Sequence, residues 1–443
     1  MKLFKHQEEA LEQTKDFDNV AYYLDMGLGK TFVGSEKMIQ IGNKVNLLIC
    51  QKSKIADWIE HFEKHYEHIQ VLNLTDKKQF AAFEFVELSA CVMVVGIINY
   101  ELAWRRKQLL QLHDFTLMLD ESSLIQNSKA KQSKFILKLQ PKNVILLSGT
   151  PCSGRYENLY SQIHLLGWKI SETLYNKQYV NWKLIDVGGF MHKVVDKEEP
   201  YKNVDRLKQK LREHGAVFMK TEECFDLPGQ NFIIETVPTT KEYKKFMRDS
   251  IVQVHTGVFD HECDSEWDGK VYDDLHELVG ETTLVKRLYA RQLCGHYNKD
   301  KRNKFKELVE STQDRLIVFY NYNAELEALK HICDTLKRPY SQVNGQVKDL
   351  YAYENENNSV TLIQYQAGAK GLNLQKANKI IYFTLTDKCE DWMQSQKRIH
   401  RINQDRPCFY YILMCKGSIE EDVYSALQRG TDFTDDLFRK VGV

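Results

Sequence analysis

A glycine-rich heptapeptide near the start of the chain, DMGLGKT, has the residue types of a phosphate-binding loop. Gly27 and Gly29 let backbone N–H groups curl around a phosphate, and Lys30 is placed to reach the β- and γ-phosphates of a nucleotide. In such loops the hydroxyl of Thr31 is a ligand for Mg²⁺. The strict pattern has a glycine six residues before the lysine, where this chain has Leu24. The heptapeptide alone therefore fits either a P-loop or an ordinary glycine-rich turn.

Two carboxylates, Asp120 and Glu121, follow an apolar run at residues 115–119. In metal-assisted phosphoryl transfer, one carboxylate orients hydrated Mg²⁺ and another group polarises the attacking water. The pattern predicts Asp120 as a metal-binding residue and Glu121 as the general base. In isolation the same pair also fits two solvated acids after a strand.

Ser148 and Thr150 follow another apolar and β-branched run, at residues 144–147. Hydroxyl groups at a strand end beside the phosphates can sense whether the γ-phosphate is present. Both residues are therefore predicted to couple hydrolysis to movement. Without the preceding motifs, this segment would indicate only a turn.

Arg398 and Arg401 are three residues apart, which places them on one face of a predicted helix. Gln394 and Gln404 extend that face in the two directions. A guanidinium group stays charged and grips phosphate oxygens bidentately, so the pair suits a catalytic role at the γ-phosphate. For an isolated arginine pair, the alternative is a solvated helix face with salt bridges.

The elements that must position these residues follow from hydrophobic periodicity. Residues 20–24 predict a buried strand before the glycine-rich loop, and residues 32–41 predict a helix after it, whose N-terminus favours an anion. Further strands are predicted at residues 46–50, 90–95, 115–119 and 144–147, and again at residues 315–320, 360–364, 379–383 and 409–413.

Taken in this order, the motifs resemble those of superfamily 2 helicases and translocases, and they are closest to the Swi/Snf branch, which includes chromatin remodellers. The segments that favour this branch are residues 47–53, the pair Asp57-Trp58, and residues 62–65, 125–127, 218–221, 227–229 and 286–296, while residues 368–374 and 394–404 resemble the fifth and sixth helicase motifs. The resemblance extends over about residues 1 to 430 and is that of a compact bacterial or phage member.

Three positions depart from the family pattern. Ser122 and Ser123 replace the usual Ala-His after the acidic pair, Gln51 stands where a proline is common, and Asn403 stands where a glycine is common. The acidic pair itself is intact, so the resemblance still implies ATP hydrolysis. The coupling of hydrolysis to movement could be altered.

The resemblance implies an α/β fold with two RecA-like lobes built on parallel sheets, plus a mainly helical insertion between them. The expected domains are an ATP-binding lobe at residues 1–168, a helical insertion at residues 169–300 and a second lobe at residues 301–443. Independently of the resemblance, alternating strands and helices predict parallel sheets that are covered on both faces.

The resemblance also implies ATP and Mg²⁺ as cofactors. Gln7 stands in the position of the family's adenine-reading glutamine, and Gly371 and Gln404 belong to the second-lobe motifs expected to contact the nucleotide. Arg398 and Arg401 would complete the site from the second lobe as arginine fingers, which accelerate well-studied phosphoryl transfers by roughly 10³–10⁵.

Nucleic acid is the expected partner of both lobes. Lys52 and Ser53 are the candidate grips of the first lobe, and Lys370 and Asn373 are those of the second. The phosphate backbone suits such grips because its charges repeat regardless of base sequence.

Composition limits the remaining possibilities. The 443 residues carry 61 Lys and Arg against 61 Asp and Glu, so a nucleic-acid binder with this formal charge of zero needs a local basic groove. The ten cysteines lack a C-x-x-C pair, which indicates reduced thiols. Neither a signal peptide nor a membrane-spanning run is present, so the expected location is the cytoplasm, that of the bacterial host for a phage protein. The expected state is a monomer.

The predicted function is ATP-dependent translocation on DNA, double-stranded or forked, in replication, repair or recombination, alongside other proteins of those processes. A strand-separating helicase, an RNA helicase and a nucleic-acid clamp switched by ATP are the alternatives. Strand separation usually needs a hairpin or aromatic pin, and second-lobe residues 365–369 and 387–393 are too few to form one. A pin could still lie within residues 169–300, where Trp182 and Trp267 are available.

Overall fold

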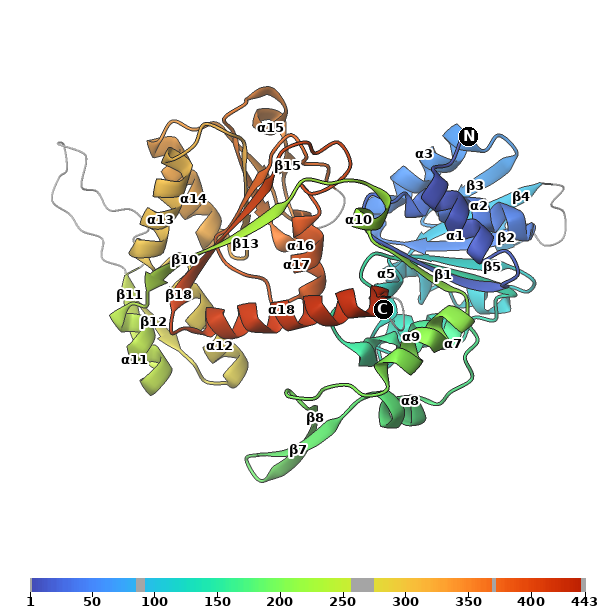
Figure 1. Ribbon diagram of the computed structural model, residues 1–443, viewed down its shortest axis with the longest axis horizontal. Helices are drawn as coiled ribbons and strands as arrows, with labels where there is room; N and C mark the ends of the chain where they lie inside the picture. The colour runs from blue at the N-terminus through green and yellow to red at the C-terminus, as the bar shows by residue number, and fades with distance from the viewer. Residues whose placement is uncertain (1, 85–91, 256–274, 369–371, 440–443) are drawn as a thin grey trace. The chain divides into compact units, whose positions relative to one another are not determined.

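The computed structural model describes residues 2–84, 92–255, 275–368 and 372–439. The chain divides into two compact units, the first made of Met1–Asp226 with Gly430–Val443 and the second of Leu227–Arg429. Figure 1 shows a sheet flanked by helices in each unit. In the described residues, no helix has the length and apolarity needed to span a membrane.

The first unit is built on a parallel sheet with the strand order β3-β4-β2-β5-β6-β1-β9. Its strands are β1 (Asn19–Leu24), β2 (Val45–Cys50), β3 (Ile69–Asn73), β4 (Met93–Asn99), β5 (Thr116–Asp120), β6 (Asn143–Ser148) and β9 (Ala216–Met219). Leu47 and Ile49 of β2 belong to one buried cluster, while Leu48 and Cys50 belong to another. Both faces of the sheet are therefore covered, as alternating strands and helices predict.

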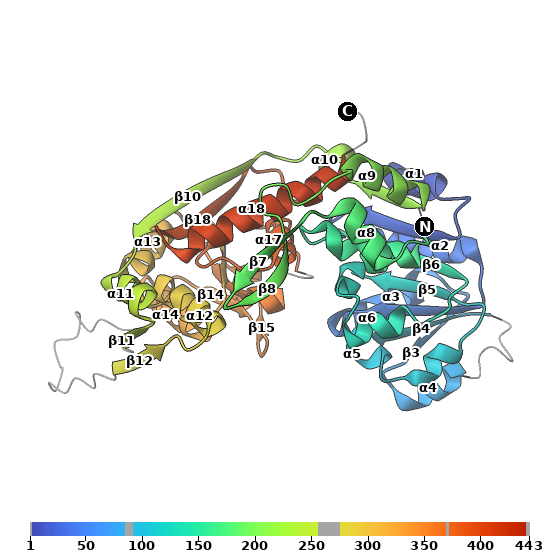
Figure 2. The same cartoon turned by 90° about the horizontal axis from the view of Figure 1, so that it is seen from below.

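The helices of the first unit connect these strands (Figure 2). They are α1 (Lys5–Gln13), α2 (Lys30–Ile41), α3 (Ile55–His65), α4 (Lys77–Glu84), α5 (Tyr100–Ala103), α6 (Lys131–Ile136), α7 (Tyr160–Leu165), α8 (Glu172–Tyr179), α9 (Val204–Glu213) and α10 (Thr221–Cys224), with 3₁₀ turns at Lys52–Lys54, Lys107–Gln111, Ser122–Ile125 and Tyr156–Leu159. The two-stranded ribbon formed by β7 (Trp182–Val187) and β8 (Phe190–Val195) leaves this unit between α8 and α9.

The second unit repeats the architecture, with the strand order β10-β18-β17-β13-β16-β14-β15. The strands are β10 (Gln230–Pro238), β13 (Leu316–Tyr320), β14 (Tyr340–Val343), β15 (Lys348–Asp349), β16 (Val360–Gln364), β17 (Lys379–Tyr382) and β18 (Cys408–Lys416). All neighbouring pairs are parallel except β14 with β15. The helices are α11 (Lys241–Asp249), α12 (Thr283–Cys294), α13 (Lys299–Glu310), α14 (Asn323–Thr335), α15 (Tyr351–Asn355), α16 (Tyr365–Gly368), α17 (Cys389–Gln396) and the start of α18 (Ile419–Phe438), and β11 (Ile251–His255) pairs with β12 (Leu275–Val279).

A distinct helical insertion, expected at residues 169–300, is not clearly shown in the part of the chain that the structure describes. The boundary between the two units falls inside this segment, after Asp226. Its strand β9 completes the first sheet, and β10 completes the second. Because both strands lie at sheet edges beside partners far away in sequence, local helical patterns gave no sign of them. Trp182 lies in β7, whereas Trp267 is outside the described residues.

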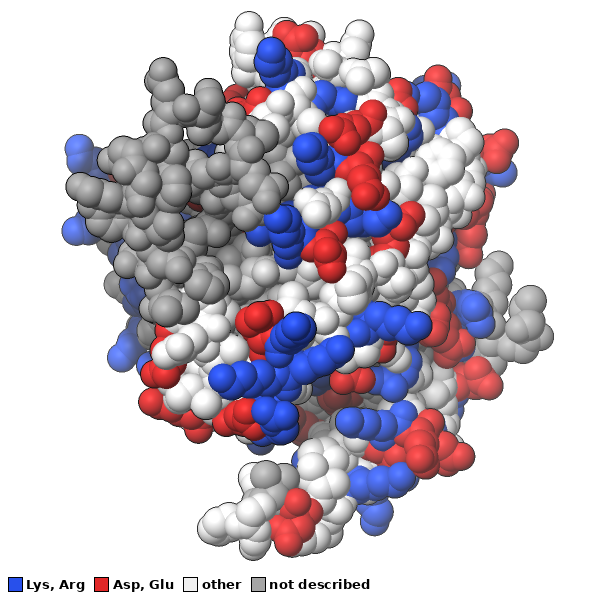
Figure 3. Space-filling model, turned by 90° about the vertical axis from the view of Figure 1, so that its left-hand side faces the viewer, with Lys and Arg blue, Asp and Glu red and all other residues white. Residues whose placement is uncertain are grey.

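Charge on the surface is mixed, in line with the formal charge of zero. On the face shown in Figure 3, Lys and Arg side chains lie among Asp and Glu side chains. Any basic groove for nucleic acid must therefore be local.

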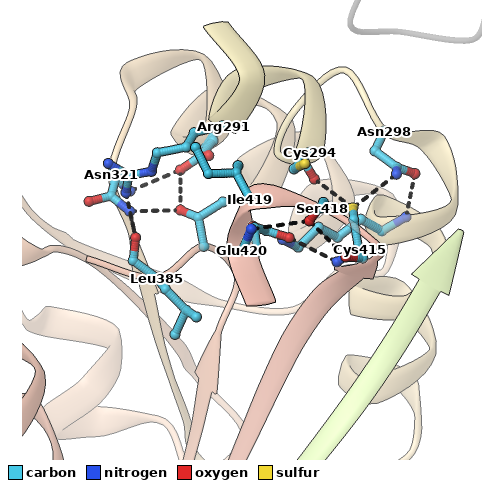
Figure 4. Close-up of polar contacts among 12 residues, drawn as sticks. Arg291, Cys294, Asn298, Asn321, Leu385, Cys415, Ser418, Ile419 and Glu420 are labelled. Atoms are coloured by element: carbon cyan, nitrogen blue, oxygen red, sulfur yellow. Dashed lines mark hydrogen bonds and ion pairs between the residues drawn. The ribbon is translucent and has the colours of Figure 1, made fainter. Parts of the chain in front are cut away.

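A buried polar cluster joins α12, α13, β18 and the start of α18 (Figure 4). The Nζ atom of Lys301 lies 2.6 Å from a carboxylate oxygen of Glu420, and both side chains are buried. The backbone N–H of Cys415 donates to the other Glu420 oxygen at 2.9 Å, and the Asn298 amide donates to the Cys415 sulfur at 3.2 Å. Removing one partner of such a pair would leave a buried charge uncompensated, so Lys301 and Glu420 stabilise these elements only as a pair.

Helix α18 ends within the first unit. Its residues from Gly430 onward are assigned there, and Thr434 accepts a hydrogen bond from the backbone N–H of Gly154 at 3.1 Å. The Tyr156 hydroxyl donates to the carbonyl of Phe433 at 2.8 Å. The end of the chain therefore packs against the segment that follows residues 148–151.

Candidate nucleotide-binding and catalytic site

The register of the first sheet brings three predicted motifs to one edge. In the parallel pairings Tyr23 lies beside Ser148, and Asp120 lies beside Leu147. The strands β1, β5 and β6 therefore end together, and the residues that follow them share the carboxyl edge of the sheet. Ligands of open α/β sheets bind at this edge.

The glycine-rich segment has the backbone of a phosphate-binding loop. Gly27 and Gly29 have φ angles of 89° and 74°, a left-handed region that side chains other than glycine rarely adopt. Helix α2 begins at Lys30, and its N-cap residue Gly29 has no side chain to occupy the first helical N–H groups. The loop therefore presents a helix N-terminus to an anion.

Lys30 lies at the centre of this edge. Its ammonium donates to the carbonyls of Leu24 at 2.9 Å and Asp25 at 3.3 Å. A Cβ atom placed on Gly149 would lie 3.4 Å from the same ammonium, so the 148–151 segment passes directly beside it. The P-loop lysine and the predicted coupling segment are thus neighbours, although they lie more than one hundred positions apart in the sequence.

Gln7 is part of the loop wall. It is buried, its side-chain oxygen accepts from the Phe4 N–H at 2.9 Å, and its amide donates to the Leu28 carbonyl at 3.1 Å. A Cβ on Gly29 would lie 2.2 Å from the Gln7 nitrogen, so any other residue here would displace the Gln7 amide besides straining the left-handed backbone. The rings of Phe4, His6 and Phe225 pack on one another, with centroid separations of 5.3 to 6.1 Å.

Asp120 is held by two aromatic side chains that sequence reasoning did not assign to the site. The indole N–H of Trp58 donates to an Asp120 carboxylate oxygen at 2.9 Å, and the Tyr100 hydroxyl donates to the Asp120 carbonyl at 2.9 Å. Burial raises the pKa of Asp120, while the Trp58 hydrogen bond and the charge of Lys30 act in the opposite direction. Only Trp58 carried a signal in the sequence, as one of the residues typical of the family.

Glu121 adopts a left-handed backbone conformation, with φ 56° and ψ 61°. This conformation is uncommon for residues other than glycine, and such backbone strain often occurs at functional sites. The turn it produces ends β5 and directs the chain into the 3₁₀ turn Ser122–Ile125.

Gln162 joins the acidic motif to the coupling segment. Its side-chain oxygen accepts from the Ser122 hydroxyl at 2.8 Å and from the Tyr23 hydroxyl at 3.0 Å. Its amide donates to the Pro151 carbonyl at 2.7 Å. Ser122, Tyr23 and Gln162 are all fully buried. Ser148 and Thr150 are buried too, and the Thr150 N–H donates to the Ser148 hydroxyl at 3.1 Å.

The first-unit residues fit ATP and Mg²⁺. The loop of Gly27 and Gly29 leaves room for backbone N–H groups to face a phosphate, with the Lys30 ammonium beside it. The Thr31 hydroxyl and the Asp120 carboxylate are hard oxygen donors of the kind that Mg²⁺ prefers.

The predicted arginine helix is wrong. Helix α17 ends at Gln396, so Arg398 and Arg401 lie in the turns that follow it rather than on one helix face. The Arg398 guanidinium donates to the Leu372 carbonyl at 3.1 Å, and Arg401 donates to the side chain of Asn373. Burial lowers the pKa of Arg401. The fifth and sixth motif segments are thus connected within the second unit.

The turns that follow α17 include one left-handed residue. Asn403 has a φ of 72°, which is the left-handed conformation that the glycine common at this position would adopt readily, and asparagine tolerates it better than most residues. Gln404 is buried, and its amide donates to the carbonyls of Ala377 at 2.8 Å and Gln375 at 3.1 Å. In this structure Gln404 therefore braces the turn. Lys370 and Gly371 lie outside the described residues.

One of the two candidate DNA grips of the first unit, Lys52, borders a hollow. Lys52 and Ser53 lie in the 3₁₀ turn after β2, and Lys52 lines a cavity of about 650 Å³ together with Asn99 and Arg105. Arg105 is exposed beside the ring of Trp104, with 5.3 Å between its guanidinium carbon and the ring centroid. The lining is mixed, since it also includes the carboxylate of Glu101, to which the Asn99 amide donates at 2.6 Å.

Comparison with known proteins identifies the family. A family model described as SNF2-related domain matches residues 20–296, and one described as helicase conserved C-terminal domain matches residues 300–403. The chain belongs to the SNF2-related family.

The relatives are distant in sequence. The chain is 21% identical to the DNA repair and recombination protein RAD54B of Gallus gallus, over 85% of this chain and 46% of that protein. It is 23% identical to the putative ATP-dependent helicase/translocase YwqA of Bacillus subtilis, over 94% of this chain and 46% of that protein. The chain spans about half the length of these relatives. The solved structure of the Sulfolobus solfataricus SWI2/SNF2 ATPase core in complex with dsDNA has a TM-score of 0.43 and 16% identity, covering 99% of this chain and 93% of that chain.

Within this family member, the structure brings together Gln7, the P-loop residues, the acidic pair and residues 148–151 in the first unit. It brings together Asn373, Arg398 and Arg401 in the second unit. Sequence reasoning missed Tyr100 and Gln162, because a hydrogen bond across a sheet edge has no fixed spacing along the chain.

Proposed function

We propose that this chain is an ATP-dependent translocase that moves on DNA, duplex or forked, during replication, repair or recombination. The observation that carries the proposal is the shared sheet edge of the first unit, where the P-loop, the acidic pair and residues 148–151 lie together. The names of RAD54B, a DNA repair and recombination protein, and of YwqA, a helicase/translocase, support DNA as the track and movement as the output.

In the proposed reaction the loop backbone and Lys30 bind the phosphates of ATP, and Glu121 accepts the proton of the attacking water. Mg²⁺, held by Thr31 and Asp120, would neutralise charge on the phosphates. The indole of Trp58 keeps the Asp120 carboxylate oriented, since it donates to one of its oxygens.

Further roles complete the proposal. Gln7 and the exposed ring of Phe4 contact the adenine, and Arg398 and Arg401 stabilise the negative charge that develops on the transferred phosphoryl group. Gly371 and Gln404 support nucleotide binding in the second lobe. The backbone of DNA is gripped by Lys52 and Ser53 in the first lobe and by Lys370 and Asn373 in the second lobe.

Several expectations from the sequence stay predictions. They are a bacterial or phage source, a cytoplasmic location, action as a monomer, and domain boundaries after residues 168 and 300.

ATP turnover across a panel of nucleic acids tests the proposal. We expect duplex or forked DNA to stimulate turnover, and RNA to stimulate it much less. Lys30→Ala should abolish turnover while DNA binding survives, because the lysine contacts phosphates of ATP and the grips lie elsewhere. Glu121→Gln should also abolish turnover, yet retain ATP binding, because only activation of water is removed.

Each outcome of this panel discriminates between functions. Stimulation by RNA alone would replace the proposal by an RNA helicase. Little turnover under every condition would indicate an ATP-switched clamp. Near-normal hydrolysis by Glu121→Gln would refute the assignment of the general base.

A further inference from the structure

The ribbon formed by β7 and β8 is a regular two-residue hairpin. Six residues of each strand pair in antiparallel register, from Trp182 with Val195 to Val187 with Phe190. Gly188 and Gly189 form the turn with φ angles of 65° and 85°, as a type I′ turn requires. The Gly189 N–H donates to the Asp186 side chain at 2.8 Å, which fixes the turn.

The distal half of this hairpin exposes large apolar side chains. Leu184, Ile185, Phe190 and Met191 are 65%, 43%, 75% and 63% exposed. The register places Leu184 and Met191 on one face of the ribbon, and Ile185 and Phe190 on the other. In Figure 3 the hairpin is the lowest projection, and it carries mainly uncharged side chains. Clustered apolar exposure of this kind marks an interaction site.

The base of the hairpin is fixed to the core of the first unit. Val180 and Tyr201 form an antiparallel bridge just below it, and the ring of Tyr201 packs on that of Tyr156 with centroids 4.5 Å apart. The Tyr201 hydroxyl donates to Glu157 at 2.9 Å. The base of the hairpin is thus anchored on the 3₁₀ turn Tyr156–Leu159 of the first unit.

Cations accompany the apolar tip. Lys193 lies opposite Leu184 and 4.8 Å from the centre of the Trp182 ring, His192 lies opposite Ile185, and Lys183 is bridged to Asp196 at 2.9 Å. An apolar wedge with flanking cations suits nucleic acid, because Phe, Leu, Ile and Met unstack bases when they insert between them. The adjacent ammonium groups suit the phosphates.

We propose that the β7–β8 hairpin contacts unstacked bases at a branch point of DNA, with Phe190 stacked on a base. The proposal rests on the proposed function for the choice of DNA as partner, and it specifies a branched substrate. Strands in a ribbon lie about 4.8 Å apart, so the hairpin is narrow enough to enter the opening between two diverging strands, or a major groove about 12 Å wide.

Equilibrium binding of the full chain without ATP tests the proposal. The probes are a fork with 2-aminopurine at its first unpaired position and a blunt duplex of equal length. We expect the wild type to prefer the fork. Phe190→Ala should weaken fork binding by about tenfold, because stacking on an aromatic ring contributes roughly 1–3 kcal/mol per base.

Two matched variants sharpen the test. Phe190→Trp keeps an aromatic face and should retain the fork preference. Leu284→Ala removes an 81% exposed leucine from α12, and it should change neither the affinity for the fork nor the affinity for the blunt duplex. Blunt-duplex binding and duplex-stimulated ATP turnover should be the same in all variants.

Three results would overturn the hairpin proposal. The first is an equal loss of affinity for fork and duplex in Phe190→Ala, and the second is no loss of affinity for either. The third is a change in the sedimentation or melting temperature of Phe190→Ala, which would indicate that the tip contacts protein instead of DNA. Failure of duplex DNA to stimulate wild-type turnover would instead count against the translocase, since the binding test uses no ATP.

Discussion

Ser122 departs from the usual family residue, and the structure provides it with a partner. Where an alanine is common after the acidic pair, the Ser122 hydroxyl donates to Gln162 at 2.8 Å. The same glutamine binds Tyr23 and Pro151, so it links the acidic motif, β1 and the coupling segment through one buried amide. Such a fully satisfied buried network positions its members more rigidly than packing alone.

We therefore predict that Gln162→Leu uncouples hydrolysis from DNA. The substitution keeps the volume but leaves the Ser122 and Tyr23 hydroxyls and the Pro151 carbonyl without this partner. Each buried group orphaned in this way costs about 1–3 kcal/mol. ATP affinity should change little, whereas DNA-stimulated turnover should fall by about tenfold, as expected for an interaction worth roughly 1.4 kcal/mol in the transition state.

The double variant Ser122→Ala/Gln162→Leu is the control. Because it removes one of the orphaned hydroxyls, it should recover part of the lost stability and turnover. Wild-type stimulation by DNA in the single variant would show that Gln162 has only a structural role.

At this scale, residue types and local spacing predicted the P-loop and the two hydroxyl residues at 148 and 150, and the structure brings these motifs together with the acidic pair. The contact of Trp58 with Asp120 spans 62 positions and that of Ser122 with Gln162 spans 40. Contacts at such separations depend on strand order, which no local pattern contains.

Among the elements, the buried strands were the most predictable. Apolar runs located β1, β2, β5 and β6, with bounds within a residue or two, because strands in a covered parallel sheet are apolar on both faces. The strand predicted at residues 90–95 begins later, as β4 is Met93–Asn99. Edge strands such as β10 were missed because their pairing partners lie far away in the sequence, and α17 ends at Gln396, before the arginines.

The end of α18 is an element whose role can be measured. Lys208 of α9 is buried, and its ammonium lies 2.7 Å from Asp436, which also accepts from the Tyr156 hydroxyl at 3.1 Å. Asp436→Asn would leave this ammonium with a weaker partner. We expect the free energy of unfolding of the first unit to fall by about 2 kcal/mol. This is less than the 3–5 kcal/mol expected when a fully buried ion pair is broken, because Asp436 is partly exposed.

Hydrogen exchange of the β1 and β6 amides would report this loss for the first unit alone. The matched control is Glu12→Gln, which breaks an ion pair with Lys15 whose two side chains are 70% and 58% exposed. The control should have almost no effect. If the β1 and β6 amides are equally protected from exchange in Asp436→Asn and in the control, the end of α18 does not stabilise the first unit in the proposed way.

For the whole molecule, two units with the same architecture suit a motor that grips DNA with each unit in turn. The resemblance predicted this repetition correctly, whereas the boundary between the units falls inside the segment expected to be a separate insertion. The strands β9 and β10 explain the difference, since they draw the two ends of that segment into different sheets.

Movement along duplex DNA and separation of its strands can be distinguished at this scale. Parting a duplex costs about 1.4 kcal/mol of stacking per base-pair step, whereas tracking along it requires no base pair to open.

We therefore expect the wild type, given ATP, to displace the third strand of a triplex, and Lys30→Ala to leave it in place. Phe190→Ala should displace it as the wild type does, because a triplex with an intact duplex track offers no unstacked bases to the hairpin. Gel analysis of the released strand measures all three. Unwinding of a tailed duplex without any triplex displacement would replace the translocase by a strand-separating helicase, and loss of that unwinding in Phe190→Ala would identify the hairpin as its pin.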